Sequence, residues 1–271
     1  MIKDKQFPRI NYIGNKEKIA PWICKKFPKE VRSVFDSFSG GCSISYELKK
    51  RGFQVITNDI LKINALISRA IIVNDKITLD QNDIDKIRAG KPKKGFMYHN
   101  YSNVHFFERE CMELDQYKAN IFKYLKGFKK DLAMVLLRRS MIRKMPYSRF
   151  NIRWSKIVQL RDEHYSYEKY KRKRAYHNQS FLDHMQSNVN LYNNAVFSSG
   201  LKHKSYNQDV FYLAPRIQAD LIYIDPPYSG TMNNYFGFYG LLDELICEKK
   251  LRSFNNNFTV KKENKLNLDK L

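Results

Sequence analysis

The chain has only four cysteines among its 271 residues, Cys24, Cys42, Cys111 and Cys247, and they are scattered along the sequence. Without a C-x-x-C pair, neither a zinc site nor a disulfide framework is indicated. The six histidines also lack metal-binding spacing, so we expect no metal. No apolar signal region opens the chain, and no apolar run reaches the roughly 18 residues of a membrane span. These absences predict a soluble, cytoplasmic protein.

Acidic residues are scarce relative to basic ones. The 27 Asp and Glu face 49 Lys and Arg, which gives a formal net charge of +22. Such an excess favours a polyanionic partner. The 18 Tyr and 18 Phe favour nucleic acid over a membrane surface, because aromatic rings can stack on bases. The alternative is a lysine-rich proteome that raises the isoelectric point of every protein.

The stretch 221–228, Leu-Ile-Tyr-Ile-Asp-Pro-Pro-Tyr, is the clearest local signal. Its first four residues predict a buried strand, and the two prolines end that strand because proline lacks an N–H and has a fixed φ. Asp225 is therefore expected at the carboxyl end of a strand, where open α/β sheets bind ligands. A carboxylate, fixed carbonyl groups and the ring of Tyr228 suit a nucleobase with an exocyclic amine. The alternative is a capping aspartate at a strand exit.

Residues 34–59 predict a β-α-β unit. An apolar strand at 34–38 is followed by a turn of small residues at 39–43, a helix to about Arg51 and a second strand at 53–57. Glycines in the first turn let the backbone approach a ligand, and Asp59 after the second strand can bind ribose hydroxyl groups. The full G-x-G-x-x-G pattern is absent, which favours a nucleoside ligand without a pyrophosphate.

The rest of the chain predicts helices over 19–27, 60–79 and 115–145, with a polar loop at 81–110. Residues 147–180 are basic and aromatic, and we predict a DNA-backbone surface there and at the end of the preceding helix. A solvated helical face is the alternative. The candidate DNA-binding residues are Arg139, Arg143, Lys144, Arg149, Arg153, Lys171, Arg172, Lys173 and Arg174. Asp209 precedes the 221–228 strand and either reaches the nucleoside pocket or caps a helix.

Taken in order, these segments resemble the Dam-like, D12-class (α-group) DNA N6-adenine methyltransferases. The resemblance covers residues 9–245. It rests on the stretches 11–16 (Asn-Tyr-Ile-Gly-Asn-Lys), 35–41 (Phe-Asp-Ser-Phe-Ser-Gly-Gly), 95–102 and 235–239, on Asp59, and on Asp-Pro-Pro-Tyr at 225–228. The turn is Phe-Ser-Gly-Gly where the family more often has Phe-x-Gly-x-Gly.

The resemblance implies an α/β fold, a Rossmann-like S-adenosylmethionine-dependent methyltransferase sheet with an inserted, mainly helical, basic target-recognition domain. The catalytic domain would comprise 1–84 and 206–248, the DNA-binding insertion 85–205, and a polar basic tail 249–271. The implied cofactor is S-adenosyl-L-methionine. The implied cofactor residues are Tyr12, Lys16, Phe38, Gly40, Gly41, Asp59, Asp209 and Asp225; the implied catalytic residues are Asp225, Pro226 and Tyr228.

The implied activity is transfer of a methyl group to N6 of a flipped-out adenine in double-stranded DNA, within a restriction–modification system. Asp225 and the Pro226 carbonyl would accept the amine protons, and Tyr228 would stack on the base. Three alternatives stay open: a non-catalytic DNA-binding or specificity subunit, half of a split methyltransferase that needs a partner chain, and methylation of RNA or of cytosine N4.

The segment after Tyr228 is short, and its end, from 260 to 271, has no clear apolar strand. The family fold adds further strands after this point, so the chain resembles a member that lacks the usual C-terminal part. Because an uncovered parallel sheet edge is a liability, we expect a second methyltransferase subunit or a homodimer. A stable, active monomer in light scattering would contradict that expectation.

Overall fold

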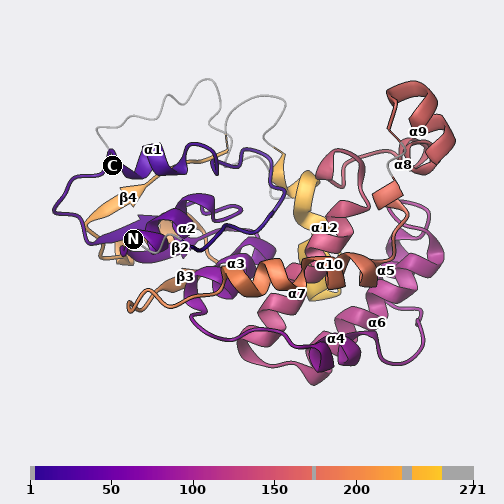
Figure 1. The fold of residues 1–271 in the computed structure, drawn as a ribbon, viewed down its shortest axis with the longest axis horizontal. Helices are drawn as coiled ribbons and strands as arrows, with labels where there is room; N and C mark the ends of the chain where they lie inside the picture. Colours follow the sequence, from indigo (N-terminus) through magenta and orange to yellow (C-terminus); the bar gives the residue numbers. More distant parts are fainter. Residues whose placement is uncertain (1–3, 173–174, 228–233, 252–271) are drawn as a thin grey trace.

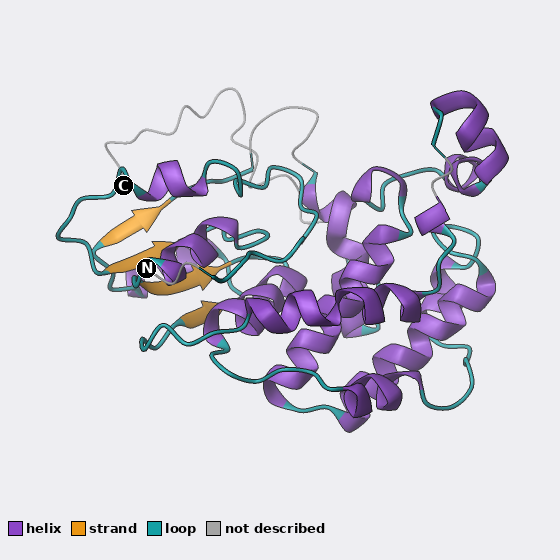
Figure 2. Cartoon of the chain, viewed as in Figure 1, coloured by secondary structure: helices purple, strands orange, loops and turns teal. Residues whose placement is uncertain are grey.

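The computed structural model describes residues 4–172, 175–227 and 234–251. Its centre is a four-stranded, all-parallel sheet in the order β3-β2-β1-β4. The strands are β1 (Ser33–Asp36), β2 (Gln54–Asn58), β3 (Lys204–Tyr206) and β4 (Leu221–Tyr223). Figure 2 shows this sheet on one side of the molecule and most of the helices on the other. The α/β class with a mainly helical insertion is confirmed.

One face of the sheet is fully covered. Val34 of β1, Val55 of β2 and Leu221 of β4 lie in register and point to the same face, because side chains alternate along strands. Val34 and Val55 are completely buried. Helices α2 (Ser43–Lys50) and α3 (Lys62–Ser68) pack on this face, and α2 connects the parallel neighbours β1 and β2. A π-helical turn, Arg69–Val73, continues α3, so the helix predicted over 60–79 is shorter than expected.

The opposite face of the sheet is only partly covered. Phe35 of β1 and Ile56 of β2 pack there against Leu213, the last residue of the short helix α11 (Val210–Leu213). Ile222 of β4 lies in register with Phe35, on the same face, yet it is 48% exposed, and Ile224 is 47% exposed. The prediction of a buried strand was therefore wrong: among the residues that the structure describes, β4 lies at the edge of the sheet and one of its faces is open.

Most of the remaining helices form a body beside the sheet, at the right of Figure 1, whereas α1 lies at the left, on the sheet side of the molecule. The loop predicted at 81–110 contains two helices, and the single helix predicted over 115–145 is two helices separated at Leu125 and Lys126. None of the helices in the described ranges is long and apolar enough to cross a membrane. The helices not yet given are α1 (Ala20–Cys24), α4 (Gln81–Arg88), α5 (Phe96–Tyr101), α6 (Glu108–Tyr124), α7 (Gly127–Arg143), α8 (Trp154–Arg161), α9 (Glu163–Tyr170), α10 (Phe181–Ala195) and α12 (Tyr235–Cys247).

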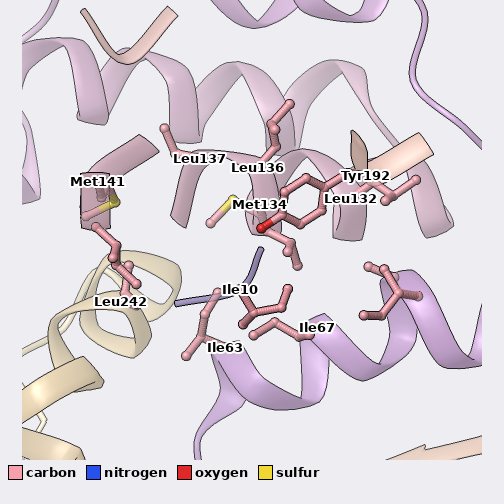
Figure 3. Close-up of a cluster of buried hydrophobic side chains, with 14 of the residues drawn as sticks. Ile10, Ile63, Ile67, Leu132, Met134, Leu136, Leu137, Met141, Tyr192 and Leu242 are labelled. Carbon is pink, nitrogen blue, oxygen red and sulfur yellow. The ribbon is translucent and has the colours of Figure 1, made fainter. Parts of the chain in front are cut away.

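Helix α7 is the centre of the main hydrophobic core. Its residues from Asp131 to Ile142 are all buried, so other parts of the protein cover this stretch on every side. Figure 3 shows Leu132 and Leu136 of α7 near Tyr192 of α10, and Met141 of α7 near Leu242 of α12, with residues of α3 also in the cluster. One hydrophobic cluster therefore joins the sheet to the helical body. The proposed boundaries at 84/85, 205/206 and 248/249 remain predictions.

Candidate active site

A pocket lies at the carboxyl ends of β1, β2 and β4. This position follows from the sheet topology, because parallel strands end at the same edge. Predicted residues from distant parts of the sequence come together there. The pocket is lined by Tyr12, Lys16, Phe38, Gly40, Gly41, Asp59, Asp225 and Pro226. Tyr228, predicted to stack on the base, lies outside the described residues.

Asp225 and Lys16 form an ion pair in this pocket. Lys16 Nζ lies 2.8 Å from Asp225 Oδ2, with both side chains about one-fifth exposed. Lys16 Nζ also donates to the carbonyl of Gly14 at 3.1 Å. Asp225 follows β4 by two residues, and Pro226 and Pro227 hold the exit from the strand extended. The lysine from the N-terminal segment thus holds the carboxylate at the strand end.

Gly40 occupies the turn between β1 and α2. Its φ is +49°, which favours glycine, and an added Cβ would lie 2.7 Å from Tyr12 Cε1. The Gly40 N–H donates to Asp59 Oδ2 at 2.8 Å, and the Leu61 N–H donates to Asp59 Oδ1 at 2.8 Å. Asp59 therefore ties the first turn to the end of β2. Each of its oxygens keeps acceptor capacity for a ligand hydroxyl group.

Tyr12 forms the aromatic side of the pocket. Its ring stacks on Tyr239 at 4.9 Å between centroids and on Tyr235 at 5.5 Å. The Asn64 amide donates to its hydroxyl at 3.3 Å. Burial and the nearby Asp59 carboxylate raise the pKa of Tyr12 well above its usual value, so the phenol stays neutral. The ring packs against the Gly40–Gly41 turn, which explains why both turn residues lack side chains.

Asp36 is a pocket residue that the sequence reasoning did not single out. It ends β1, it is 1% exposed, and its Oδ2 accepts a 2.5 Å hydrogen bond from Ser45. Its Oδ1 has no partner in the described part of the protein. Burial raises the pKa of Asp36 to about 7. The sequence could have indicated Asp36, because it lies near the carboxyl end of the first predicted strand just as Asp59 follows the second.

Asp209 does not line the pocket, contrary to one of its two predicted roles. It is the N-cap of α11, and its side chain accepts from the Phe211 N–H at 2.9 Å. Its neighbours Gln208 and Val210 do line the pocket. Gln208 is held by Asn58, whose side-chain oxygen accepts the Gln208 N–H at 3.1 Å. Asn58 and Gln208 are therefore site residues that the sequence reasoning missed.

Two of the predicted DNA-binding residues are buried rather than on an open surface. Arg139 is 4% exposed and Lys144 is 2% exposed. Lys144 forms an ion pair with Glu110 at 2.9 Å, and Arg161 makes a two-bond contact with the same carboxylate at 2.5 and 2.8 Å. The prediction was wrong for Lys144, because its ammonium group is buried and paired with Glu110 inside the helical body. Arg139 lies at the base of a cavity.

The other predicted DNA-binding residues differ in exposure. Arg153, Lys171 and Arg172 are exposed, near or after the short helices α8 and α9. Arg143 and Arg149 are half-buried against aromatic rings, with the Arg143 guanidinium 4.4 Å from the centroid of Tyr176. Their DNA contacts remain predictions. Lys173 and Arg174 lie outside the described residues.

Comparisons with known proteins complete the description of the site. A family model described as "D12 class N6 adenine-specific DNA methyltransferase" matches residues 12–269. Type II methyltransferase M2.HphI of Haemophilus parahaemolyticus is 56% identical over 262 residues, which cover 97% of this chain and 78% of that protein. Type II methyltransferase M.CviAII of Paramecium bursaria Chlorella virus 1 is 25% identical, covering 90% and 71%. Type II methyltransferase M.FokI of Planomicrobium okeanokoites is 22% identical, covering 87% and 36%.

Proposed function

The chain belongs to the D12 class of N6 adenine-specific DNA methyltransferases, and we propose that it methylates adenine N6 in duplex DNA within a Type II restriction–modification system. The observation that carries the proposal is the pocket that joins Asp225, Lys16 and Asp59 at the ends of three parallel strands. The restriction–modification context is supported by the relatives, each of which is named a Type II methyltransferase.

S-adenosyl-L-methionine is the methyl donor of this family. When bound, it supplies an electrophilic methyl group on a positively charged sulfur, which leaves as a neutral thioether. The pocket fits this molecule. Lys16 offers a cation for its carboxylate, the unpartnered Asp36 Oδ1 offers a buried acceptor for its ammonium group, and Asp59 offers acceptors for its ribose hydroxyl groups.

Asp225 and Pro226 carry the catalytic proposal. The lone pair of adenine N6 is delocalised into the ring, so the amine is a poor nucleophile. The Asp225 carboxylate and the Pro226 carbonyl accept hydrogen bonds from the two N6–H groups and stabilise the positive charge that develops on N6. The methylated nitrogen then releases one proton to solvent and becomes neutral. Lys16, 2.8 Å from Asp225, holds the carboxylate in place for that role. The adenine must leave the duplex to reach the pocket, with Tyr228 proposed as its stacking partner.

The test is transfer of a labelled methyl group from S-adenosyl-L-methionine to mixed-sequence duplex DNA, with nucleoside analysis of the product. We expect N6-methyladenine from the wild type and a loss of about a hundredfold or more with Asp225→Ala. The matched control is Asp220→Ala, which removes a carboxylate that accepts from the Ser33 N–H at 2.7 Å, at the opposite end of β1. N4-methylcytosine, or transfer only to RNA, would contradict the substrate assignment. DNA binding without transfer would favour a non-catalytic subunit.

The open edge of the sheet supports a further part of the proposal, a homodimer. In residues 4–172, 175–227 and 234–251 no strand pairs with the outer side of β4. Ile222 of β4 and Ile224 are half exposed, and on the sheet face to which Ile222 points, α11 carries Phe211 and Tyr212, which are 72% and 69% exposed. A two-fold dimer pairs a patch with itself, so this apolar edge complements the same edge of a second copy.

A further inference from the structure

A second cavity, of about 760 Å³, lies outside the cofactor pocket. Its walls come from the N-terminal segment 5–9, from α2, and from α7 and α10. Ser43, at the start of α2, borders both this cavity and the cofactor pocket, and Lys50, the last residue of α2, lines only the second. An eight-residue helix is about 12 Å long. The second cavity therefore extends alongside α2, away from the catalytic carboxylate.

The lining of this cavity carries an excess of positive charge. Five cationic side chains face two acidic ones, Glu17 and Glu47. Glu47 already pairs with Arg51 at 2.7 Å and with Lys50 at 3.5 Å. The five cations are Lys5, Arg9, Lys50, Arg139 and Arg143. In the described parts of the chain, no carboxylate lies within ion-pair distance of Arg9, Arg139 or Arg143.

Arg139 forms the base of the cavity. Its side chain donates from Nε to Asn188 at 3.4 Å, while its buried NH1 group has no hydrogen-bond partner among the described residues. Burial, together with repulsion from Arg143, Arg138 and Arg9, lowers the pKa of Arg139 to about 10. It therefore remains charged at neutral pH. A buried cation without a counter-charge is unfavourable, and an anion in the cavity would offset that cost.

The two other arginines lie closer to solvent. Arg9 is exposed, and Arg143 is half-buried with its guanidinium 4.4 Å from the centroid of the Tyr176 ring. The ring contact orients Arg143 before any ligand binds. Guanidinium groups bind phosphate oxygens through two parallel hydrogen bonds. One buried and two accessible guanidinium groups thus suit a tetrahedral anion that enters from solvent.

We propose that this cavity binds a backbone phosphate of the DNA substrate, with Arg139 at its base and Arg9 and Arg143 at its mouth. This inference rests on the proposed function, which brings DNA to the neighbouring pocket. With about 3.4 Å of rise per nucleotide, the length of α2 spans three to four nucleotides. The contacted phosphate therefore lies a few nucleotides from the flipped adenine, and the contact sets the position of the strand without reading its sequence.

The test measures duplex DNA binding by fluorescence anisotropy at a series of salt concentrations, using the full chain. The variants Arg143→Gln and Arg9→Gln alter residues at the mouth, so the buried Arg139 stays intact. We expect the slope of log K against log salt to become less steep by about 0.9 for each lost phosphate contact. Raising the salt from about 50 to about 200 mM would then reduce the affinity of each variant about three- to fourfold less than that of the wild type.

Arg109→Gln is the matched control, because it removes the same charge from a side chain that is 85% exposed on α6 and pairs with Glu113 at 3.5 Å. Its slope should equal that of the wild type. Equal slopes for Arg143→Gln and Arg109→Gln, in a chain that methylates DNA, would overturn the phosphate site alone. Absence of methyl transfer by the wild type would instead reject the proposed function. Stabilisation by inorganic phosphate that Arg143→Gln abolishes, with unchanged DNA slopes, would assign the cavity to a free anion and overturn the DNA assignment.

Discussion

At the scale of single residues, Asp36 is a pocket carboxyl group whose pKa depends strongly on its surroundings. It is buried at the end of β1, bonded to Ser45, and close to the Asp225 and Asp59 carboxylates. Burial raises its pKa from 3.8 to about 7. Between these two pH values the folded protein therefore keeps the Asp36 proton, whereas the unfolded chain has released it. The cofactor's ammonium group would favour the ionised form, because it places a cation beside the unpartnered oxygen.

The elevated pKa of Asp36 predicts the pH dependence of stability. The pKa is raised from 3.8 to about 7, so the free energy of unfolding falls as pH rises through that window and levels off above it. Asp36→Asn should remove this contribution, up to about 1.4 kcal/mol per pH unit, in urea unfolding curves followed by fluorescence. Ser45→Ala removes a hydrogen bond to the ionised carboxylate, so it should raise the pKa of Asp36 in the folded protein and extend the fall in stability to higher pH. Wild-type and Asp36→Asn curves that run parallel would contradict this account.

At the scale of elements, the turn between β1 and α2 sets the shape of the cofactor pocket. Gly40 has a positive φ and Tyr12 packs against it, so the turn cannot accept a side chain. We predict that Gly40→Ala lowers stability by about 1–3 kcal/mol and weakens binding of S-adenosyl-L-methionine, measured by calorimetry. Gly200→Ala is the matched control, because Gly200 has φ +79° but nothing within 4 Å of an added Cβ. Unimpaired cofactor binding by Gly40→Ala would show that the close approach of Tyr12 is dispensable.

The helical body is held by an ion cluster between α6, α7 and α8. Glu110 of α6 pairs with Lys144, just after α7, and with Arg161 of α8. Glu110→Gln leaves the buried Lys144 without its counter-charge, so we predict a loss of about 3–5 kcal/mol in the free energy of unfolding.

Glu113→Gln on the same helix is the control for the ion cluster. Glu113 pairs with the largely exposed Arg109, so its loss should cost less than about 1 kcal/mol. Equal effects of the two substitutions on chemical unfolding would mean that Lys144 does not depend on Glu110. In that case the conclusion that Lys144 serves the interior of the helical body, and does not contact DNA, would no longer be supported.

At the scale of the whole molecule, the open β4 edge and the net charge of +22 act against each other. The apolar edge favours self-association, and the shared positive charge opposes it. Salt screens the repulsion and leaves apolar contact intact. We predict that light scattering shows a dimer whose fraction rises with salt, and that Ile222→Lys, which alters a half-exposed side chain, makes the chain monomeric at all salt concentrations.

Two outcomes would reject the homodimer. A wild-type monomer with full methyltransferase activity would show that the edge needs no cover. A wild-type monomer without activity would indicate that a different subunit covers the edge. Val158→Lys is the control, because Val158 is 39% exposed on α8, away from the sheet, and should leave the dimer unchanged.

Local rules were sufficient to locate much of the site. Two prolines end a strand wherever they occur, so the position of Asp225 followed from its neighbours alone. The Gly40–Gly41 turn and Asp59 followed from the alternation of strand, turn and helix, because parallel strands bring their carboxyl ends together. The sequence by itself therefore determined the α/β class, the position of the pocket at the strand ends and most of the predicted residues that line it.

Tertiary packing decided the rest, because burial depends on which segments meet in space. Among the strands that the structure describes, it placed β4 at the edge of the sheet with Ile222 half exposed, although the apolar run predicts a fully buried strand. It placed Lys144 against Glu110 inside the helical body, although the sequence shows only another basic residue at a helix end. It also gathered Arg9 and Arg139, which lie far apart in sequence, around one cavity. Charge and hydropathy are properties of residues, whereas exposure and pairing are properties of the fold.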